Sequence, residues 1–220
     1  MKINEHDFYS ERANWSFEDI DYTSEVITNW IYEDEIKKRV KENTKILDLG
    51  TAAGEKVLKN FPNCAEILGT DFSDKMIETA NKNLLQSGRK NISFRVMDNL
   101  KMDTPDNYFD LVTARHTIID PLQIYKTLKE GGQLIVRGVD KLDAGFKEVE
   151  LIPLHVIEYY KTKKDLYALL VKTPILDDFS EKSFNEYERR IIEKEMFEKY
   201  VKQNTTEKGI KLIRRYYGII

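Results

Sequence analysis

Two aspartates and the glycine-rich segment between them have the clearest chemical potential in this chain. The segment Asp48-Leu49-Gly50-Thr51-Ala52-Ala53-Gly54 follows an apolar run, and Asp71 ends the next one. An acidic residue about 20 positions after a glycine turn, at the end of a second strand, can accept hydrogen bonds from ribose hydroxyls. These residues predict a site for a nucleoside-containing cofactor.

The spacing of the small residues favours one kind of cofactor. A dinucleotide fingerprint, G-x-G-x-x-G, uses its later glycines for pyrophosphate approach and for helix packing. Here the pattern is Gly50-x-Ala52-x-Gly54, and Glu55 puts a carboxylate where a diphosphate would approach. An adenosine with a short zwitterionic sulfonium tail needs only close backbone approach, for which Gly54 is expected to leave room. The turn therefore favours S-adenosylmethionine.

Alternating strand and helix patterns surround this segment. Buried strands are expected at 45–49, 67–71, 92–97, 109–114 and 133–136. A helix capped by Ser73 and ended by Gly88 is expected to bury Ile77, Ala80 and Leu84, and one that begins at Pro121 is expected to bury Leu122, Tyr125 and Leu128. The alternation predicts a parallel sheet.

The order of these motifs resembles that of class I S-adenosylmethionine-dependent methyltransferases, in particular methyltransferase type 11-like domains. The first motif of that family, D/E-x-G-x-G-x-G, fits Asp48 to Gly54 with alanine at the middle glycine. The matching segments together span residues 40–139. The resemblance implies an α/β, Rossmann-like fold with a seven-stranded, mostly parallel sheet, an antiparallel last strand, helices on both faces, and a helical insertion between strands six and seven.

The resemblance also implies the cofactor-binding residues. Asp71 would bind the ribose, Phe72 would pack on the adenine, and Asp98 would meet the adenine amino group. The full expected set is Asp48, Gly50, Thr51, Ala52, Gly54, Asp71, Phe72, Met97, Asp98, Asn99, Ala114 and Arg115.

Two residues directly after the fourth strand are candidates for catalysis. The neutral imidazole of His116 could accept a proton from an oxygen or nitrogen nucleophile, and Arg115 could steer an anionic substrate. The alternative for His116 is a hydrogen-bonded loop residue. Methyl transfer does not require a base, because alignment and desolvation can supply much of the acceleration. His155 is expected to be a hydrogen-bonded sheet residue, and Glu148, Glu150 and Glu158 are expected on a solvated strand face.

A chain of 220 residues is expected to form one domain. Its expected parts are an N-terminal helical arm (1–42), a cofactor-binding core (43–160), a helical insertion (161–205) and the last strand (206–220). In the arm, Ser24 is expected to cap a helix with Ile27, Trp30 and Ile31 on one face, after the aromatic residues Tyr9, Trp15 and Tyr22. This arm could cover the cofactor or pad the sheet.

The crossover after the fifth strand is short. The segment Val139–Gly145 leads to an expected sixth strand at Phe146–Ile152, whereas a crossover with its helix needs at least about 10 residues. Either this helix is a stub, or residues are missing near Val139-Asp140.

The insertion is expected to hold two helices. Thr162 and Asp165 predict a capping box for a helix that buries Leu166, Leu169 and Leu170 and ends at Thr173-Pro174. The second helix would bury Phe184, Tyr187, Ile191, Phe197 and Tyr200, and the last strand would follow at 211–217. The pair of helices is expected to cover the acceptor side or to buttress the sheet edge.

Composition restricts partners and location. The net charge of −3 disfavours a non-specific nucleic-acid binder. Cys64 is the only cysteine, which excludes an intramolecular disulfide and a cysteine-rich zinc site. We expect a reduced, cytoplasmic protein without a metal. Because no apolar run approaches about 18 residues and the start lacks a signal-peptide core, no membrane partner is expected.

The favoured function is methyl transfer from S-adenosylmethionine to a small-molecule acceptor, with S-adenosylhomocysteine as the product. Methylation of an rRNA or tRNA base is the alternative, because residues 168–174 loosely resemble bacterial rRNA guanine-N1 methyltransferases; this chain lacks the cysteine zinc module of those enzymes. An NAD-linked oxidoreductase and a non-catalytic S-adenosylmethionine-binding module also stay open. The sequence identifies neither the acceptor atom nor the oligomeric state.

Overall fold

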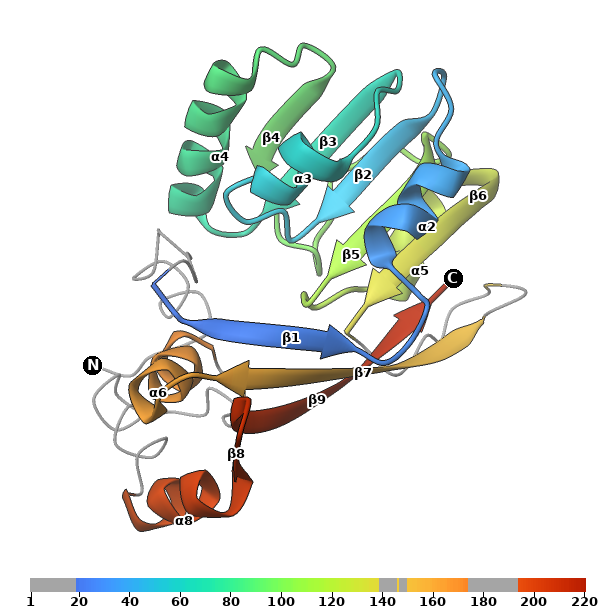
Figure 1. The fold of residues 1–220 in the computed structure, drawn as a ribbon. Helices are drawn as coiled ribbons and strands as arrows, with labels where there is room; N and C mark the ends of the chain where they lie inside the picture. The colour runs from blue at the N-terminus through green and yellow to red at the C-terminus, as the bar shows by residue number, and fades with distance from the viewer. Residues whose placement is uncertain (1–18, 139–145, 147–149, 174–193) are drawn as a thin grey trace. The chain divides into compact units, whose positions relative to one another are not determined.

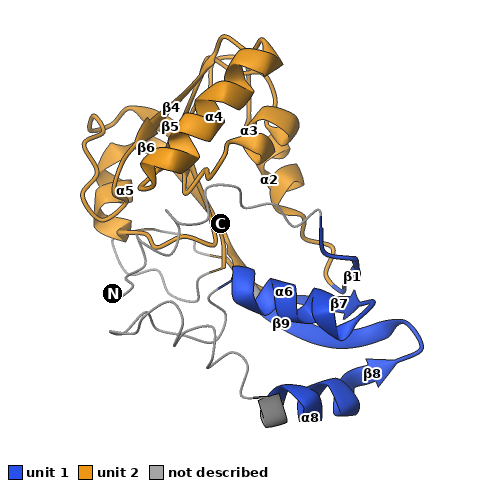
Figure 2. Ribbon diagram, turned by 90° about the vertical axis from the view of Figure 1, so that its left-hand side faces the viewer, with its two compact units in different colours: residues 1–27, 155–215 blue, residues 28–154, 216–220 orange. Residues whose placement is uncertain are grey.

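The computed structural model describes residues 19–138, 146, 150–173 and 194–220 (Figure 1). The chain divides into two compact units, one formed by residues 28–154 with 216–220 and the other by residues 1–27 with 155–215 (Figure 2). Strands β7 (Leu151–Tyr160) and β9 (Gly209–Ile219) run through both units. The expected single domain over the whole chain stays a prediction.

A mostly parallel sheet forms the centre of the first unit. Strands β2 (Lys45–Leu49), β3 (Glu66–Asp71), β4 (Ile92–Val96), β5 (Phe109–Arg115) and β6 (Leu128–Arg137) are parallel and lie in the order β6-β5-β2-β3-β4. The end of β9 pairs antiparallel with β6, and β7 follows β9 in the strand order. This arrangement confirms the predicted Rossmann-like α/β fold with an antiparallel last strand. In the part of the chain that the structure describes, the sheet has nine strands instead of the expected seven, because one further strand pairs with β7 and another with β9.

Helices cover both faces of this sheet. Alternate residues of β2 point into different clusters: Ile46 packs with residues of α2 (Tyr32–Arg39), α3 (Glu55–Asn60) and α4 (Asp74–Ser87), and Leu47 packs with Ile124 of α5 (Pro121–Thr127). Ile46, Leu47 and Ile124 have no exposed surface. The near-continuous apolar runs of these strands follow from burial on both faces.

Local signals placed α4 correctly. The Ser73 hydroxyl accepts a hydrogen bond from the Met76 backbone, Gly88 adopts a left-handed conformation at the end, and Ile77 and Ala80 are buried.

The predicted buried face of α5 is wrong. Leu122 and Tyr125 are 62% and 53% exposed, whereas Ile124 and Thr127 are buried. Leu128 is buried, as expected, but it is the first residue of β6 and not part of the helix. The buried face of α5 therefore includes Ile124 and Thr127 instead of Leu122 and Tyr125.

The predicted N-terminal helix is also wrong. Residues Tyr22–Val26 form strand β1, which pairs antiparallel with β7 from Tyr22↔Tyr160 to Val26↔Val156. Ser24 therefore caps no helix, and the first described helix, α2, begins at Tyr32. All five residues of β1 are exposed, so pairing with β7 rather than an apolar pattern determines this strand. Tyr9 and Trp15 lie outside the described residues.

In the second unit, α6 (Lys163–Lys172) confirms the capping box. The Thr162 hydroxyl accepts from the Asp165 backbone and the Asp165 side chain accepts from the Thr162 backbone. The predicted residues Leu166, Leu169 and Leu170 are buried, and Phe197 and Tyr200 of α8 (Lys194–Asn204) pack against the same cluster. Strand β8 (Thr205–Thr206) pairs with β9. Phe184, Tyr187 and Ile191 lie outside the described residues, and covering of the acceptor side stays a prediction.

The sixth predicted strand begins later than expected. Strand β7 starts at Leu151, and Phe146 contacts Tyr125 edge to face, with ring centroids 5.7 Å apart. The segment Val139–Gly145, and with it the hypothesis of missing residues, lies outside the described residues.

Glu158 was misplaced by the sequence pattern, whereas His155 lies in strand β7, as expected. Glu158 is 7% exposed and accepts hydrogen bonds from Tyr160 (2.6 Å) and Arg214 (3.3 Å). The expected solvated face is therefore wrong for Glu158, because its carboxylate is buried with a donor two residues away, Tyr160, and one 56 residues away, Arg214. His155 is exposed, as is Glu150, and Glu148 lies outside the described residues.

Candidate functional site

The glycine turn between β2 and α3 is a backbone structure with three left-handed residues. Gly50, Ala52 and Gly54 have φ values of +70°, +49° and +75°. A side chain at such a φ costs about 1 to 2 kcal/mol, so Ala52 is strained and needs support. The turn is held by hydrogen bonds from the Thr51 backbone to Thr70 O (2.9 Å) and from the Ala52 backbone to Asp71 Oδ2 (3.0 Å).

Both glycines are required by packing inside the protein. A Cβ at Gly50 would lie 2.6 Å from Thr117 Cβ, and a Cβ at Gly54 would lie 2.7 Å from Phe94 Cζ. The missing side chain of Gly54 makes room for the Phe94 ring, and the expectation that Gly54 also leaves room for a cofactor stays a prediction. Both glycines shape the turn by packing against other parts of the protein.

Asp71 joins the turn to the start of α4. Its Oδ2 accepts from Ala52 N, its Oδ1 accepts from Ser73 N (3.0 Å), and the residue is 8% exposed. Burial raises the pKa of this carboxyl, and the hydrogen bonds from the Ser73, Ala52 and Phe72 backbones partly oppose the rise. A carboxylate has about four acceptor positions, so Asp71 keeps acceptor capacity for a ligand.

Asp48 is the second buried carboxyl of the site. It is 7% exposed and accepts a hydrogen bond of 2.6 Å from the Thr113 hydroxyl. Burial raises its pKa to about 6, although the Thr113 hydrogen bond and the charge of Arg115 lower it. An acidic group kept in an unfavourable environment is typical of functional sites.

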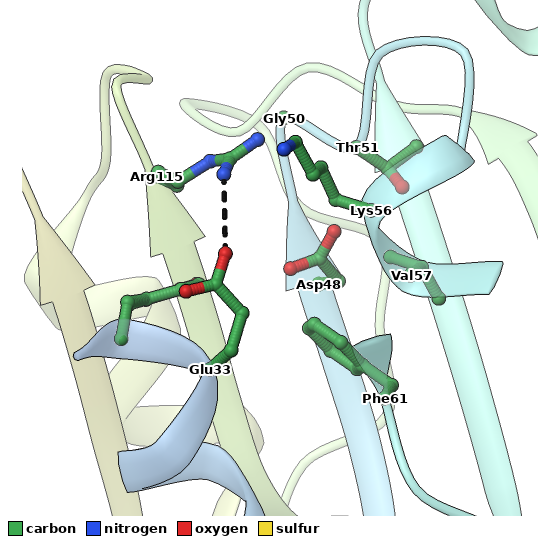
Figure 3. A pocket seen from close by; sticks show the side chains of 9 residues that line it. Glu33, Asp48, Gly50, Thr51, Lys56, Val57, Phe61 and Arg115 are labelled. Atoms are coloured by element: carbon green, nitrogen blue, oxygen red, sulfur yellow. Dashed lines mark ion pairs between the residues drawn. The ribbon is translucent and has the colours of Figure 1, made fainter. Parts of the chain in front are cut away.

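A pocket opens beside Asp48 and the glycine turn (Figure 3). Its lining residues are Tyr32, Glu33, Asp48, Gly50, Thr51, Lys56, Val57, Phe61 and Arg115. Its volume of about 20 Å³ is room for about one water molecule. The pocket is therefore one polar corner of a binding site, and most of a nucleoside cofactor would lie outside it.

Opposite charges line this pocket. Glu33 and Arg115 form an ion pair with 3.5 Å between Oε1 and Nη1, and Asp48 and Lys56 add one charge of each sign (Figure 3). The sequence predicted Asp48, Gly50, Thr51 and Arg115 here. It missed the other lining residues, which are Tyr32, Glu33, Lys56, Val57 and Phe61. Tyr32 and Glu33 were missed because the N-terminal helix was predicted too early in the chain.

Two hydroxyl groups of the pocket lack a hydrogen-bond partner of normal geometry within the described residues. The Tyr32 and Thr51 hydroxyls are buried, and within the described residues neither makes a hydrogen bond of normal geometry. The Tyr32 hydroxyl lies near Thr113 and the Thr51 hydroxyl near Asp48, close enough to influence the pKa of Tyr32 and of Asp48. Buried polar groups are nearly always satisfied, so these hydroxyls indicate that the pocket receives a polar ligand group.

The residues after β4 lie beside Asp71 but line no part of the described pocket. Met97 is buried and its backbone donates to Asp71 O (2.9 Å). Asp98 is exposed and accepts from Leu100 N (2.9 Å). The Asn99 amide donates to Thr117 Oγ1 (3.0 Å) and Ile118 O (3.1 Å). Asn99 thus holds the loop after β5. Adenine contact by Phe72 and Asp98, and cofactor binding by Met97 and Asn99, stay predictions.

His116 also lies apart from the described pocket. It is exposed, has a strained φ of +53°, and its backbone donates to Arg137 O (2.8 Å). Its neighbour Ala114 is fully buried in the core rather than in the pocket. His116 nevertheless follows β5 at the carboxyl edge of the sheet, the edge at which α/β folds bind ligands. Within the described residues, no cluster of histidine, cysteine or acidic groups could hold a metal ion.

Comparison with known proteins places the chain among methyltransferases. A family model described as a methyltransferase domain matches residues 40–205. An uncharacterized methyltransferase of Bacillus subtilis, YcgJ, is 26% identical over 91 residues, which are 41% of this chain and 36% of the relative. A phosphoethanolamine N-methyltransferase of Plasmodium falciparum is 27% identical over 184 residues, 76% of this chain and 66% of the relative. The chain thus spans less than two thirds of either relative.

Solved structures share the fold. A functionally unknown protein from Deinococcus radiodurans R1 has a TM-score of 0.61 and 11% identity, with 96% of each chain covered. The crystal structure of YcgJ has a TM-score of 0.53 and 16% identity, with 86% of this chain and 95% of that chain covered. Within the described part of this chain, no helix is both long and apolar enough to span a bilayer.

Proposed function

The chain belongs to the methyltransferase-domain family, and we propose that it transfers a methyl group from S-adenosylmethionine to a small-molecule acceptor. The observation that carries the proposal is the bond between Ala52 N and Asp71 Oδ2 (3.0 Å). This bond fixes an acidic side chain against a glycine turn at the carboxyl ends of two neighbouring parallel strands, where this class of fold binds nucleoside cofactors.

The chemistry of the pocket fits this cofactor. Two acidic residues, Glu33 and Asp48, and two basic residues, Lys56 and Arg115, line the pocket. Charged groups of both signs are therefore available to a zwitterion. The Tyr32 and Thr51 hydroxyls, which make no hydrogen bond of normal geometry within the described residues, would gain partners. These features suit the amino-acid end of S-adenosylmethionine better than a diphosphate.

Each part of the site has a separate proposed task. S-adenosylmethionine supplies a methyl group on a positively charged sulfur. Asp71 binds the ribose, and Asp48 and Arg115 hold the polar tail. His116, at the carboxyl edge, accepts a proton from the acceptor where the acceptor has one to lose. The main contribution of the chain is alignment of the two reactants and exclusion of water.

A small-molecule acceptor is supported by the name of one relative. The phosphoethanolamine N-methyltransferase of Plasmodium falciparum is named for a small acceptor, and its match covers 76% of this chain. The acidic chain, with its net charge of −3, also disfavours a polyanionic acceptor such as RNA.

Calorimetric titration with S-adenosylmethionine and S-adenosylhomocysteine tests the cofactor, and a screen for methyl transfer to metabolite and RNA pools tests the acceptor. We expect S-adenosylmethionine and S-adenosylhomocysteine to bind and NAD to bind far more weakly. In the screen, a labelled methyl group should be transferred to a small molecule. Binding of NAD without binding of S-adenosylhomocysteine would replace the proposal with an oxidoreductase. Labelled RNA would replace the acceptor class.

A further inference from the structure

The ion pair between Glu33 and Arg115 joins two distant parts of the chain at the pocket wall. Glu33 lies in the first turn of α2, and Arg115 is the last residue of β5. Their side chains are 22% and 28% exposed, so both charges are partly withdrawn from water. Figure 3 shows the pair on one side of the pocket, with Asp48 and Lys56 across from it.

The geometry of this pair leaves both groups able to bind something else. The distance of 3.5 Å between Glu33 Oε1 and Arg115 Nη1 exceeds the roughly 2.7 to 2.9 Å of a strong charge-assisted hydrogen bond. A guanidinium has five donors and a carboxylate about four acceptor positions. One loose contact therefore uses little of the capacity of either side chain.

We propose that Glu33 and Arg115 together select the zwitterionic amino-acid end of the cofactor, with Arg115 receiving its carboxylate and Glu33 its ammonium group. This inference rests on the proposed function. It makes α2 a source of specificity, although α2 lies outside the glycine motif. It also means that the pair exchanges one internal contact for two contacts with the ligand.

The exchange predicts an unusual response to incomplete ligands. A ligand with the carboxylate but no ammonium group would occupy Arg115 and leave Glu33 unpaired beside a second negative charge. Neutralising Glu33 should remove that repulsion and improve binding of this ligand. A ligand with the ammonium group but no carboxylate would leave Arg115 unpaired, and neutralising Arg115 should improve its binding. Loss of structure could not produce either gain.

The test is a titration of three ligands: S-adenosylhomocysteine, its analogue without the amino group, and its analogue without the carboxylate. The proteins are the wild type, Glu33→Gln, Arg115→Gln and the control Asp34→Asn. Asp34 is an exposed acid of the same helix that pairs with Lys37 and does not line the pocket. Circular dichroism verifies that all four proteins are folded.

Both pocket variants should bind S-adenosylhomocysteine about tenfold more weakly, as expected for loss of one charged contact. Glu33→Gln should bind the analogue without the amino group more tightly than the wild type does. Arg115→Gln should do the same for the analogue without the carboxylate. Asp34→Asn should match the wild type for all three ligands.

Equal weakening of all three ligands by Glu33→Gln, or no change for any of them, would overturn the inference and leave the proposed function intact. Failure of the wild type to bind S-adenosylhomocysteine would overturn the proposed function, and the inference with it.

Discussion

Replacing Asp48 with asparagine should make the protein more stable and less able to bind its cofactor. Burial raises the pKa of Asp48 from 3.8 to about 6, so the native state holds this proton more tightly than the unfolded chain does. Stability therefore falls as the pH rises from 3.8 to 6, where the unfolded state ionises first. The shift corresponds to about 3 kcal/mol of stability lost at neutral pH.

Asparagine removes the free-energy cost of ionising a buried carboxyl group. It also keeps an oxygen that can accept the 2.6 Å hydrogen bond from Thr113. Urea unfolding at pH 7.5, followed by tryptophan fluorescence, measures the effect because Trp30 lies in the core of the same unit. The free energy of unfolding should rise by up to about 3 kcal/mol. If it falls by roughly 2 kcal/mol per molar urea, the midpoint of urea unfolding should rise by up to roughly 1.5 M. The gain should shrink as the pH falls below 6.

Asp110→Asn is the matched control. Although burial of Asp110 favours its neutral form, hydrogen bonds from the Lys129 side chain and the Lys45 backbone lower its pKa overall. Neutralising Asp110 should therefore destabilise the protein at pH 7.5, opposite to Asp48. Asp48→Asn should also weaken S-adenosylhomocysteine binding, because a residue that lowers the stability of the protein is often retained for its role in function. Lower stability of Asp48→Asn at pH 7.5, or the same gain at pH 4, would refute the reasoning.

Three further substitutions test other parts of the site. Asp71→Ala should weaken S-adenosylmethionine binding at least about tenfold by calorimetry, because hydrogen bonds to charged groups contribute about 1.5 to 3 kcal/mol each; unchanged affinity would remove the site assignment. Gly54→Ala should lower the melting temperature, because the new Cβ would lie 2.7 Å from Phe94 Cζ and the residue has a φ of +75°. Adding Phe94→Leu to this variant should restore part of the lost melting temperature. An unchanged melting temperature for Gly54→Ala alone would contradict the packing argument. His116→Gln should reduce methyl transfer at saturating cofactor without changing S-adenosylhomocysteine affinity, and full activity would leave His116 as a loop residue.

Signals confined to a few neighbouring residues were predicted well from the sequence. The Ser73 cap, the left-handed Gly88 and the capping box of Thr162 and Asp165 each depend on contacts within four residues. The apolar strands were also found, because burial on both faces produces continuous apolar runs.

Features decided by distant contacts were missed. Strand β1 has five exposed residues and exists through its pairing with β7. Helix α2 follows Ile31, which provides no side-chain cap, so no local signal placed Tyr32 and Glu33 at the pocket. Burial of Glu158 depends partly on Arg214, which lies 56 positions along the chain. The loose resemblance of residues 168–174 to rRNA guanine-N1 methyltransferases stays a prediction, as does the covering of the acceptor side by the inserted helices.

The structure of this protein with S-adenosylhomocysteine bound would test the central claim most directly. The account predicts ribose hydroxyls hydrogen-bonded to Asp71, the amino-acid end between Glu33 and Arg115, and a glycine turn held by the same Ala52–Asp71 bond. A ligand bound away from Asp71, or a ribose with no contact to its carboxylate, would contradict the account.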